Sequence, residues 1–262
     1  MIRCKKESIE WLEFEQLQEF PNLVHGVFLR HGGVSQGAFG SLNLGGGTGD
    51  LDESIAENRS RVSEILGLET LVSSKQVHGV HLESVPSSSP LIETGCDGLV
   101  TCQPELGLLI KHADCQAAIF FDPIKRVVAN IHCGWRGNVQ NIYAKTVATL
   151  KQQYDCNPAD LLVCISPSLG PENAQFIHYE TELPEEFHPF QVSAQYFDFW
   201  QIAKMQLRGA GILEDHIEMA KICTSAGEED FFSYRRDKNT GRHGTVIALK
   251  QTRSNEENPL TF

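Results

Sequence analysis

Three short apolar runs in the middle of the chain constrain its fold more than any other feature. They span residues 106–110, 117–121 and 127–131, and turns such as Asp122-Pro123 separate them. Apolar runs of this length, without polar alternation, are typical of strands that are buried on both faces. The sequence therefore predicts a central sheet that other elements cover.

Helices and later strands are expected around these runs. Asp50 or Asp52 can cap a first helix that Gly67 ends, and Asn138 can cap a second. The residues alone predict the class α/β or α+β with a mixed sheet. The helices are predicted at 53–66, 139–154 and 196–207, with further strands at 161–165, 217–223 and 245–250.

Composition narrows the class of protein. The 262 residues carry a formal charge of −12, which disfavours binding to nucleic acid or to anionic lipid. Met1 to Glu15 is charged throughout and has no apolar signal-peptide core, so we expect a cytoplasmic protein.

The eight cysteines contain no CxxC pair and are expected as free thiols or metal ligands. Pro86 to Pro90 is expected to be a surface loop.

Residues that can bind a metal ion lie in three separate segments. These are Gln76 to Gly79, His112 to Cys115, and His132 to Gly137. Two histidines and one cysteine would leave the fourth position of tetrahedral zinc to water or substrate, as in catalytic sites. Taken singly, such a histidine or cysteine is more often a surface or core residue. The segments alone therefore leave the metal role as one hypothesis.

Strand alternation separates the two cysteines near these segments. If Val127 to Cys133 is extended, His132 and Cys133 point to opposite faces and cannot easily bind one ion. Cys133 then suits the core, and Cys115 is the expected thiolate. His112, Asp114 and His81 are secondary candidates, and the Asp114 carboxylate could orient a ligating imidazole or cap a helix.

Arg136 lies between Gly134 and Gly137 at a predicted turn from strand to helix. Glycines allow the backbone to approach a ligand closely, and a helix N-terminus favours an anion. Arginine adds a fixed positive charge with two-pronged geometry. The sequence therefore predicts that Arg136 contacts a phosphate or another anion.

Several motifs together resemble one known family. The chain is similar to the YfiH-like family, whose members are labelled laccase-domain or polyphenol oxidoreductase proteins and also purine nucleoside phosphorylases. The similarity runs from about residue 26 to 248. It rests on 41–44 with 49–50, Asn58-Arg59, 76–79, 97–101, 113–115, 132–137, 232–236 and 240–242.

The resemblance implies an α/β (α+β) fold over 1–262, a single-domain layered sandwich with mixed sheets flanked by helices. It also implies zinc ligands at His78, Cys115 and His132. Cu²⁺ could replace Zn²⁺ in vitro, because it binds nitrogen and sulfur ligands more tightly. The resemblance further implies phosphorolysis of adenosine, inosine, guanosine and methylthioadenosine, together with deamination of adenosine. The expected partners are therefore a nucleoside and phosphate, with no nucleic acid, membrane or protein partner evident. The expected catalytic residues are Cys115, His132, Arg136 and Asp114, and the expected substrate-binding residues are Asn43, Arg59 and Arg136.

Other functions remain open on the sequence. A cysteine hydrolase would use Cys115 as nucleophile, a histidine as base and Asp114 as orienting group. A non-enzymatic sensor would use the same pocket without turnover. The older label implies copper-dependent phenol oxidation, but multicopper centres need paired imidazoles, and the 10 histidines include no HxH pair. Metal content and thiol reactivity distinguish these readings.

Overall fold

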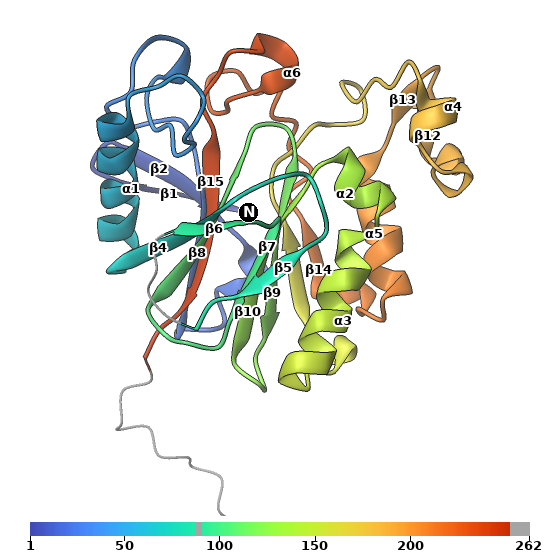
Figure 1. Cartoon of the computed structure of the whole chain (residues 1–262), viewed down its shortest axis with the longest axis horizontal. Coiled ribbons are helices and arrows are strands. Elements are labelled where there is room, and N and C mark those ends of the chain that lie inside the picture. Colours follow the sequence, from blue (N-terminus) through green and yellow to red (C-terminus); the bar gives the residue numbers. More distant parts are fainter. Residues whose placement is uncertain (87–90, 252–262) are drawn as a thin grey trace, which may run out of the picture.

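Two mixed β-sheets pack face to face at the centre of the molecule, with helices on both outer faces (Figure 1). The computed structural model describes residues 1–86 and 91–251, so most of the loop predicted at 86–90 lies outside the described residues. The first sheet has the order β1-β2-β3-β15-β8-β4-β6. Its strands are β1 (Ile2–Lys6), β2 (Ile9–Glu13), β3 (Leu23–Phe28), β15 (His243–Leu249), β8 (Leu106–His112), β4 (Thr70–Lys75) and β6 (Leu91–Gly95).

The second sheet has the order β14-β11-β9-β10-β7-β5. Its strands are β14 (Ile217–Met219), β11 (Leu162–Ile165), β9 (Gln116–Asp122), β10 (Val127–Cys133), β7 (Gly98–Thr101) and β5 (Leu82–Ser84). A small hairpin pairs β12 (Gln191–Ser193) with β13 (Tyr196–Phe197). The α-helices are α1 (Asp52–Leu66), α2 (Trp135–Val139), α3 (Ile142–Tyr154), α4 (Tyr179–Glu182), α5 (Phe199–Gly209) and α6 (Tyr234–Asp237).

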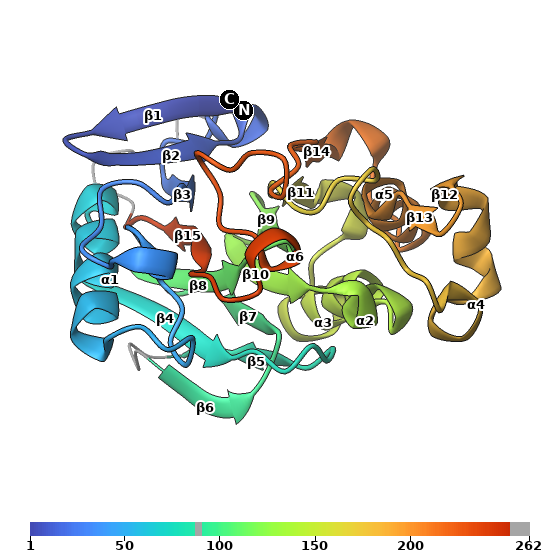
Figure 2. The ribbon, with the colours of Figure 1, turned by 90° about the horizontal axis from the view of Figure 1, so that it is seen from above.

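Side-chain alternation along the central strands builds the layers. Leu108 packs between the two sheets with Ile119, whereas its neighbour Leu109 packs with Val62 of α1. Phe120, next to Ile119, packs on the other side with Leu150 of α3. Figures 1 and 2 show α1 on one side of the sheets and α3 and α5 on the other. The prediction that the three apolar runs are strands buried on both faces is confirmed, as is the layered α/β class.

One edge of the two sheets gathers several strand ends. Strands β4 and β8 run parallel, and they end at Lys75 and His112. A short turn leads from β8 into β9, whose first residue pairs with Cys133 at the end of β10. The carboxyl ends of β4, β8 and β10 therefore lie close to the start of β9, and the three motif segments lie at these ends.

The second predicted helix is divided, and its cap is a different residue. Asn141 adopts a left-handed conformation with φ 55°, and its side chain accepts a hydrogen bond from the Ala144 N–H. This break separates α2 from α3, so the helix predicted over 139–154 begins at Ile142. Asn138, the predicted cap, lies buried within α2.

Other boundaries differ for similar local reasons. Leu51, without a side-chain cap, precedes α1, so neither Asp50 nor Asp52 caps this helix, whereas Gly67 ends it with φ 64°. The third helix begins at Phe199 because the Asp198 side chain accepts from two backbone N–H groups. The strand predicted over 217–223 is shorter in the structure, where β14 ends at Met219. Within the described residues, no helix combines the length and apolarity needed to cross a bilayer.

Candidate metal centre

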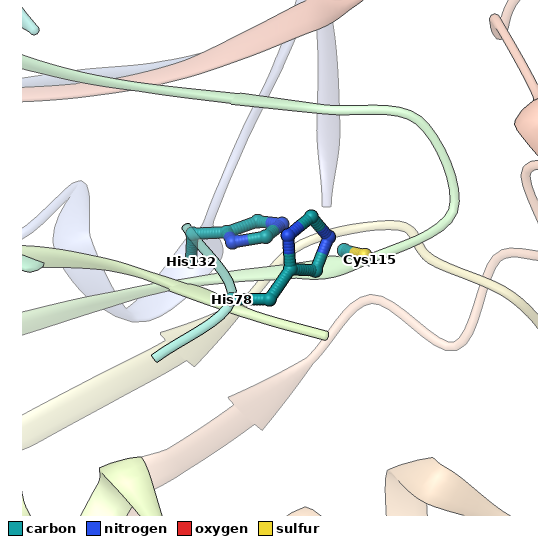
Figure 3. A group of neighbouring side chains, drawn as sticks. All are labelled: His78, Cys115 and His132. Atoms are coloured by element: carbon teal, nitrogen blue, oxygen red, sulfur yellow. The ribbon is translucent and has the colours of Figure 1, made fainter. Parts of the chain in front are cut away.

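The side chains of His78, Cys115 and His132 converge at the edge where β4, β8 and β10 end (Figure 3). One nitrogen of each imidazole and the thiol sulfur all lie within 4.8 Å of one another. His132, the last residue but one of β10, is buried, Cys115 is half-buried, and His78 is exposed. The three form a group that can hold a metal ion, and the exposed imidazole leaves one side open to solvent.

Asp97, just before β7, organises two of these side chains. Its Oδ1 accepts the Nδ1 proton of His132 at 2.8 Å and the backbone N–H of His78 at 2.9 Å. Its Oδ2 accepts the backbone N–H groups of Val77 and Gly79 at 3.1 and 2.7 Å. Burial would raise the pKa of Asp97, but the hydrogen bonds from His132 and from the Gly79 and Val77 N–H groups lower it. The buried carboxylate is therefore charged and fully paired.

The Asp97 contacts explain the conformation of the segment that carries His78. The backbone of His78 is left-handed, with φ 59°, and three successive N–H groups turn toward one carboxylate. A carboxylate accepts only, so the proton of His132 lies on Nδ1 and Nε2 stays available to a ligand. Asp97 thus holds the positions of both histidines.

Asp114 does not orient an imidazole. Its Oδ1 accepts from the Thr224 hydroxyl at 2.7 Å, and its Oδ2 accepts from the Arg235 N–H at 2.5 Å. Its backbone carbonyl accepts from the Leu169 N–H at 2.8 Å. These bonds fix the turn that carries Cys115, and the orienting role that we considered for Asp114 falls to Asp97.

Cys115 and His132 form a coupled pair. Burial would raise the pKa of the Cys115 thiol, but the charge of His132 and the hydrogen bonds from both histidines lower it. Burial would lower the pKa of His132, but the thiolate and Asp97 raise it. The pocket therefore stabilises a thiolate, which is the form that binds metal ions.

Cys133 lies in the core, on the other face of β10 from His132. It is buried and packs with Ile142 and Tyr143 of α3. Burial raises the pKa of its thiol well above the ordinary value. The alternation prediction that separated Cys133 from the metal-capable group is confirmed as a matter of position.

Two cavities meet at the group. The first has a volume of about 350 Å³ and aromatic walls from Trp135, Phe176 and Phe199. Arg136 lies at its rim, where the guanidinium carbon is 4.1 Å from the centre of the Trp135 ring. Arg136 is exposed, at the start of the five-residue helix α2.

The second cavity, of about 490 Å³, is more polar. Lys111 and Arg242 line it together with the glycine-rich loop at Gly45 to Thr48. His78, Cys115 and Tyr234 line both cavities, so the group that can hold a metal separates an aromatic pocket from a basic one.

Asn43 and Arg59 lie beneath the glycine-rich loop. The Asn43 side chain is fully buried and donates to Asp50 at 2.8 Å. Both Nε and Nη2 of Arg59 donate to the Leu44 carbonyl, at 3.0 and 2.8 Å. Neither Asn43 nor Arg59 lines either cavity. Both instead hold the glycine-rich loop, which lines the second cavity.

The remaining sequence candidates, His112 and His81, are not members of the group, although His112 lines the second cavity. Nε2 of His112 is 2.8 Å from the Thr245 hydroxyl, and its ring packs against His243. His81 is exposed beside Glu83. Within residues 1–86 and 91–251, no second group of three metal-capable side chains is found. Sequence reasoning missed Asp97, Lys111 and Tyr234; the first and last lay in the motif stretches, but nothing local marked their roles.

The layered α/β fold thus carries a His, Cys and His group that can hold a metal ion, between two cavities. A family profile described as "Multi-copper polyphenol oxidoreductase laccase" matches residues 24–250, and the chain belongs to this family. Two relatives are named purine nucleoside phosphorylases. YlmD of Geobacillus stearothermophilus is 33% identical to this chain, and the alignment covers 88% of this chain and 90% of YlmD. The relative from Bacteroides thetaiotaomicron is 28% identical, with coverages of 90% and 94%.

Solved structures show the same fold. The crystal structure of YlmD from Geobacillus stearothermophilus superposes with a TM-score of 0.85 at 30% identity, covering 95% of this chain and 98% of the other. That of the Bacillus licheniformis hypothetical protein YfiH gives 0.81 at 27% identity, with coverages of 94% and 97%. The resemblance identified from the sequence motifs is thereby confirmed.

Proposed function

We propose that this chain is a zinc-dependent purine nucleoside phosphorylase. The observation that carries the proposal is the convergence of His78, Cys115 and His132 at the junction of two cavities. Relatives named purine nucleoside phosphorylase, at 26–33% identity over most of the chain, support the reaction class.

The donor set fits zinc. Two imidazole nitrogens and one thiolate match the ligands of mononuclear catalytic zinc sites, and the pocket already favours the thiolate. Zinc held there would supply Lewis-acid chemistry. Multicopper chemistry receives no such support, because the described residues offer one group of three ligands and no further cluster.

The two cavities suit the two substrates of phosphorolysis. A flat purine base can pack against Trp135 and Phe176, with Arg136 at the rim as a further contact. In the reaction, a phosphate oxygen bonds to C1′ of the ribose while the bond from C1′ to the base nitrogen breaks. The electron pair of that bond stays with the base, which takes the proton of hydrogen phosphate. The products are free base and ribose 1-phosphate.

The expected catalytic residues have three kinds of role in this proposal. Cys115 and His132 hold the metal, with His78. Arg136 contacts the nucleoside at the mouth of the aromatic cavity. Asp114 is a positioning residue, because its carboxylate fixes the turn before Cys115.

A product assay tests the reaction. Inosine with phosphate should give hypoxanthine and ribose 1-phosphate in equal amounts, and base release should stop when phosphate is omitted. Base release at an unchanged rate in phosphate-free buffer would make the protein a nucleoside hydrolase.

Adenosine deamination is a second proposed activity of the same site. Water oxygen would replace the amino group on C6 of adenine, and ammonia would leave. Because His78 and Cys115 line both cavities, a nucleoside can present either its C1′ or its base to the metal. Ammonia release from adenosine without phosphate tests this activity, and its absence in protein that cleaves inosine would exclude deamination.

A cysteine hydrolase is the competing function, favoured by the lowered pKa of Cys115. A catalytic thiolate reacts quickly with iodoacetamide, whereas a thiolate bound to zinc is protected. Fast alkylation of protein that carries its full zinc content would support the hydrolase.

A further inference from the structure

Three cations lie at or behind the basic cavity beside the triad, and none of them pairs with a carboxylate of the described residues. Lys111, at the end of β8, and Arg242, at the start of β15, line the cavity, and Arg59 lies behind its glycine-rich loop. In residues 1–86 and 91–251 the ion pairs are made by other cations, such as Arg61 with Glu57 and Lys204 with Glu214. These cations lie together in a chain that carries 34 acidic and 22 basic side chains, and so a net negative charge.

Backbone carbonyls take the hydrogen bonds that the structure gives these three cations. The Lys111 ammonium donates to Ser74 O at 2.6 Å. Arg59 donates to Leu44 O, and Nη1 of Arg242 donates to Thr240 O and Gly241 O at 2.7 and 2.9 Å. An ammonium has three donors and a guanidinium has five, so each head keeps N–H groups for a further acceptor.

Burial makes these charges costly without an anion. Burial, together with the nearby charge of Arg59, lowers the pKa of Lys111 to about 8. Burial also lowers the pKa values of Arg59 and Arg242. An anion beside Lys111 and Arg242, with Arg59 behind the loop, would relieve both the desolvation and the mutual repulsion.

The backbone around Lys111 is held in place, and the opposite wall leaves room. Gln76 forms two reciprocal bonds with the backbone of Lys111, at 2.7 and 2.9 Å. This pair extends the pairing of β4 with β8 and fixes where the lysine side chain begins. Across the cavity, a Cβ added at Gly46 or Gly47 would meet no atom within 4 Å. The cavity thus combines a fixed cation with open space.

We propose that this cavity binds a phosphoryl oxyanion, with Lys111 as its principal cation. The anion is the inorganic phosphate co-substrate, an assignment that rests on the proposed function; the anion site itself does not. Phosphate in the basic cavity and the base in the aromatic one lie on opposite sides of the triad, which is the arrangement that displacement at C1′ needs. Arg136, on the aromatic side, is the competing phosphate contact.

Binding of inorganic phosphate to zinc-loaded protein, measured by calorimetry without nucleoside, tests the site directly. Lys111→Met should weaken phosphate binding roughly tenfold or more, because a charge-assisted contact is lost. Lys111→Arg should recover much of the affinity. Lys151→Met, on the exposed face of α3, is the matched control and should bind phosphate like the unaltered protein. Unchanged affinity in a folded Lys111→Met variant would overturn the proposal.

Steady-state kinetics then assign the anion. Lys111→Met should raise KM for phosphate while leaving KM for inosine within about twofold, and Arg136→Met should do the reverse. If Arg136→Met alone raises the phosphate KM, the cavity is not the phosphate site. If Lys111→Met instead weakens only the binding of inosine 5′-monophosphate, the cavity holds an ester phosphate and the co-substrate assignment is wrong. Loss of phosphate binding in Lys111→Met, in a protein that cleaves no nucleoside, would keep the site and reject the proposed function.

Discussion

Oδ1 of Asp97 accepts the Nδ1 proton of His132 at 2.8 Å, across a separation of 35 residues in the chain. The same carboxylate binds the backbone around His78, so one buried side chain holds two members of the triad. The geometry of the candidate metal centre therefore depends on a residue outside the triad, whose two carboxylate oxygens both accept hydrogen bonds.

Asp97→Asn should weaken zinc binding by roughly 10- to 100-fold, because the amide supports the imidazole and the three N–H groups less well. A competition titration with a chromogenic chelator measures this. Asp215→Asn, on the exposed turn before β14, is the matched control and should keep full affinity. Equal zinc affinity in Asp97→Asn and the unaltered protein would contradict the orienting role.

Gly134→Ala should also weaken zinc binding. A Cβ at this position would lie 2.9 Å from Cδ2 of His78 and 3.1 Å from Sγ of Cys115, so both side chains would have to move. Gly209→Ala, where an added Cβ meets nothing within 4 Å, serves as the control. Zinc content and the free energy of unfolding, measured on both variants, separate the local effect from general destabilisation. A Gly134→Ala variant with full zinc affinity would show that the close approach is unimportant.

Cys115→Ala and Cys133→Ala should behave in opposite ways. Cys115→Ala removes the anionic ligand and should abolish zinc retention and nucleoside cleavage. Cys133→Ala trims a small buried side chain, so it should cost about 1 kcal/mol of stability and leave zinc content and turnover nearly intact. Zinc per chain and ribose 1-phosphate formation are measured side by side. The reverse pattern would show that the ligand set is wrong.

The sequence predicted the parts of the fold that local pattern controls. The apolar runs of β8, β9 and β10 are continuous because both faces of these strands are buried, and Gly67 ends α1 because its left-handed conformation suits glycine. The predicted start of α3 was wrong, because Asn141 adopts a left-handed conformation at a position where no glycine indicates a break. The predictions also omitted β1 to β3, which join the first sheet beside the last strand, β15.

Only those residues of the site that belong to recognisable motifs could be predicted from the sequence. Strand alternation correctly separated His132 from Cys133, because the period of two depends on neighbouring residues alone. The roles of Asp97 and Lys111 depend on which strand ends meet at one edge, and no local spacing encodes that. A sequence shows which side chains can bind a metal or an anion, and topology decides which of them meet.

Acid should destabilise the protein through His25. This residue is 4% exposed, its Nε2 accepts the Phe14 N–H at 2.8 Å, and burial lowers its pKa to about 4. The unfolded chain takes up this proton below about pH 6.5, and the folded protein does so only near pH 4. The free energy of unfolding is therefore unaffected by His25 above about pH 6.5. It falls by roughly 3 kcal/mol through this residue as the pH drops to 4.

Urea unfolding at pH 7 and at pH 4.5 measures this loss. His25→Gln should lose less stability between the two pH values than the unaltered protein, because its side chain accepts the same N–H without titrating. His81→Gln, at an exposed histidine, should show the original loss. An identical loss in His25→Gln would remove His25 from the acid response.

The most direct test of the account is a zinc titration of chelator-stripped protein, followed by ribose 1-phosphate formation from inosine and phosphate. The His78, Cys115 and His132 triad predicts that activity is absent without metal, rises in proportion to added zinc and saturates at one zinc per chain. Full activity in the stripped protein would contradict the account, as would saturation at several metal ions per chain.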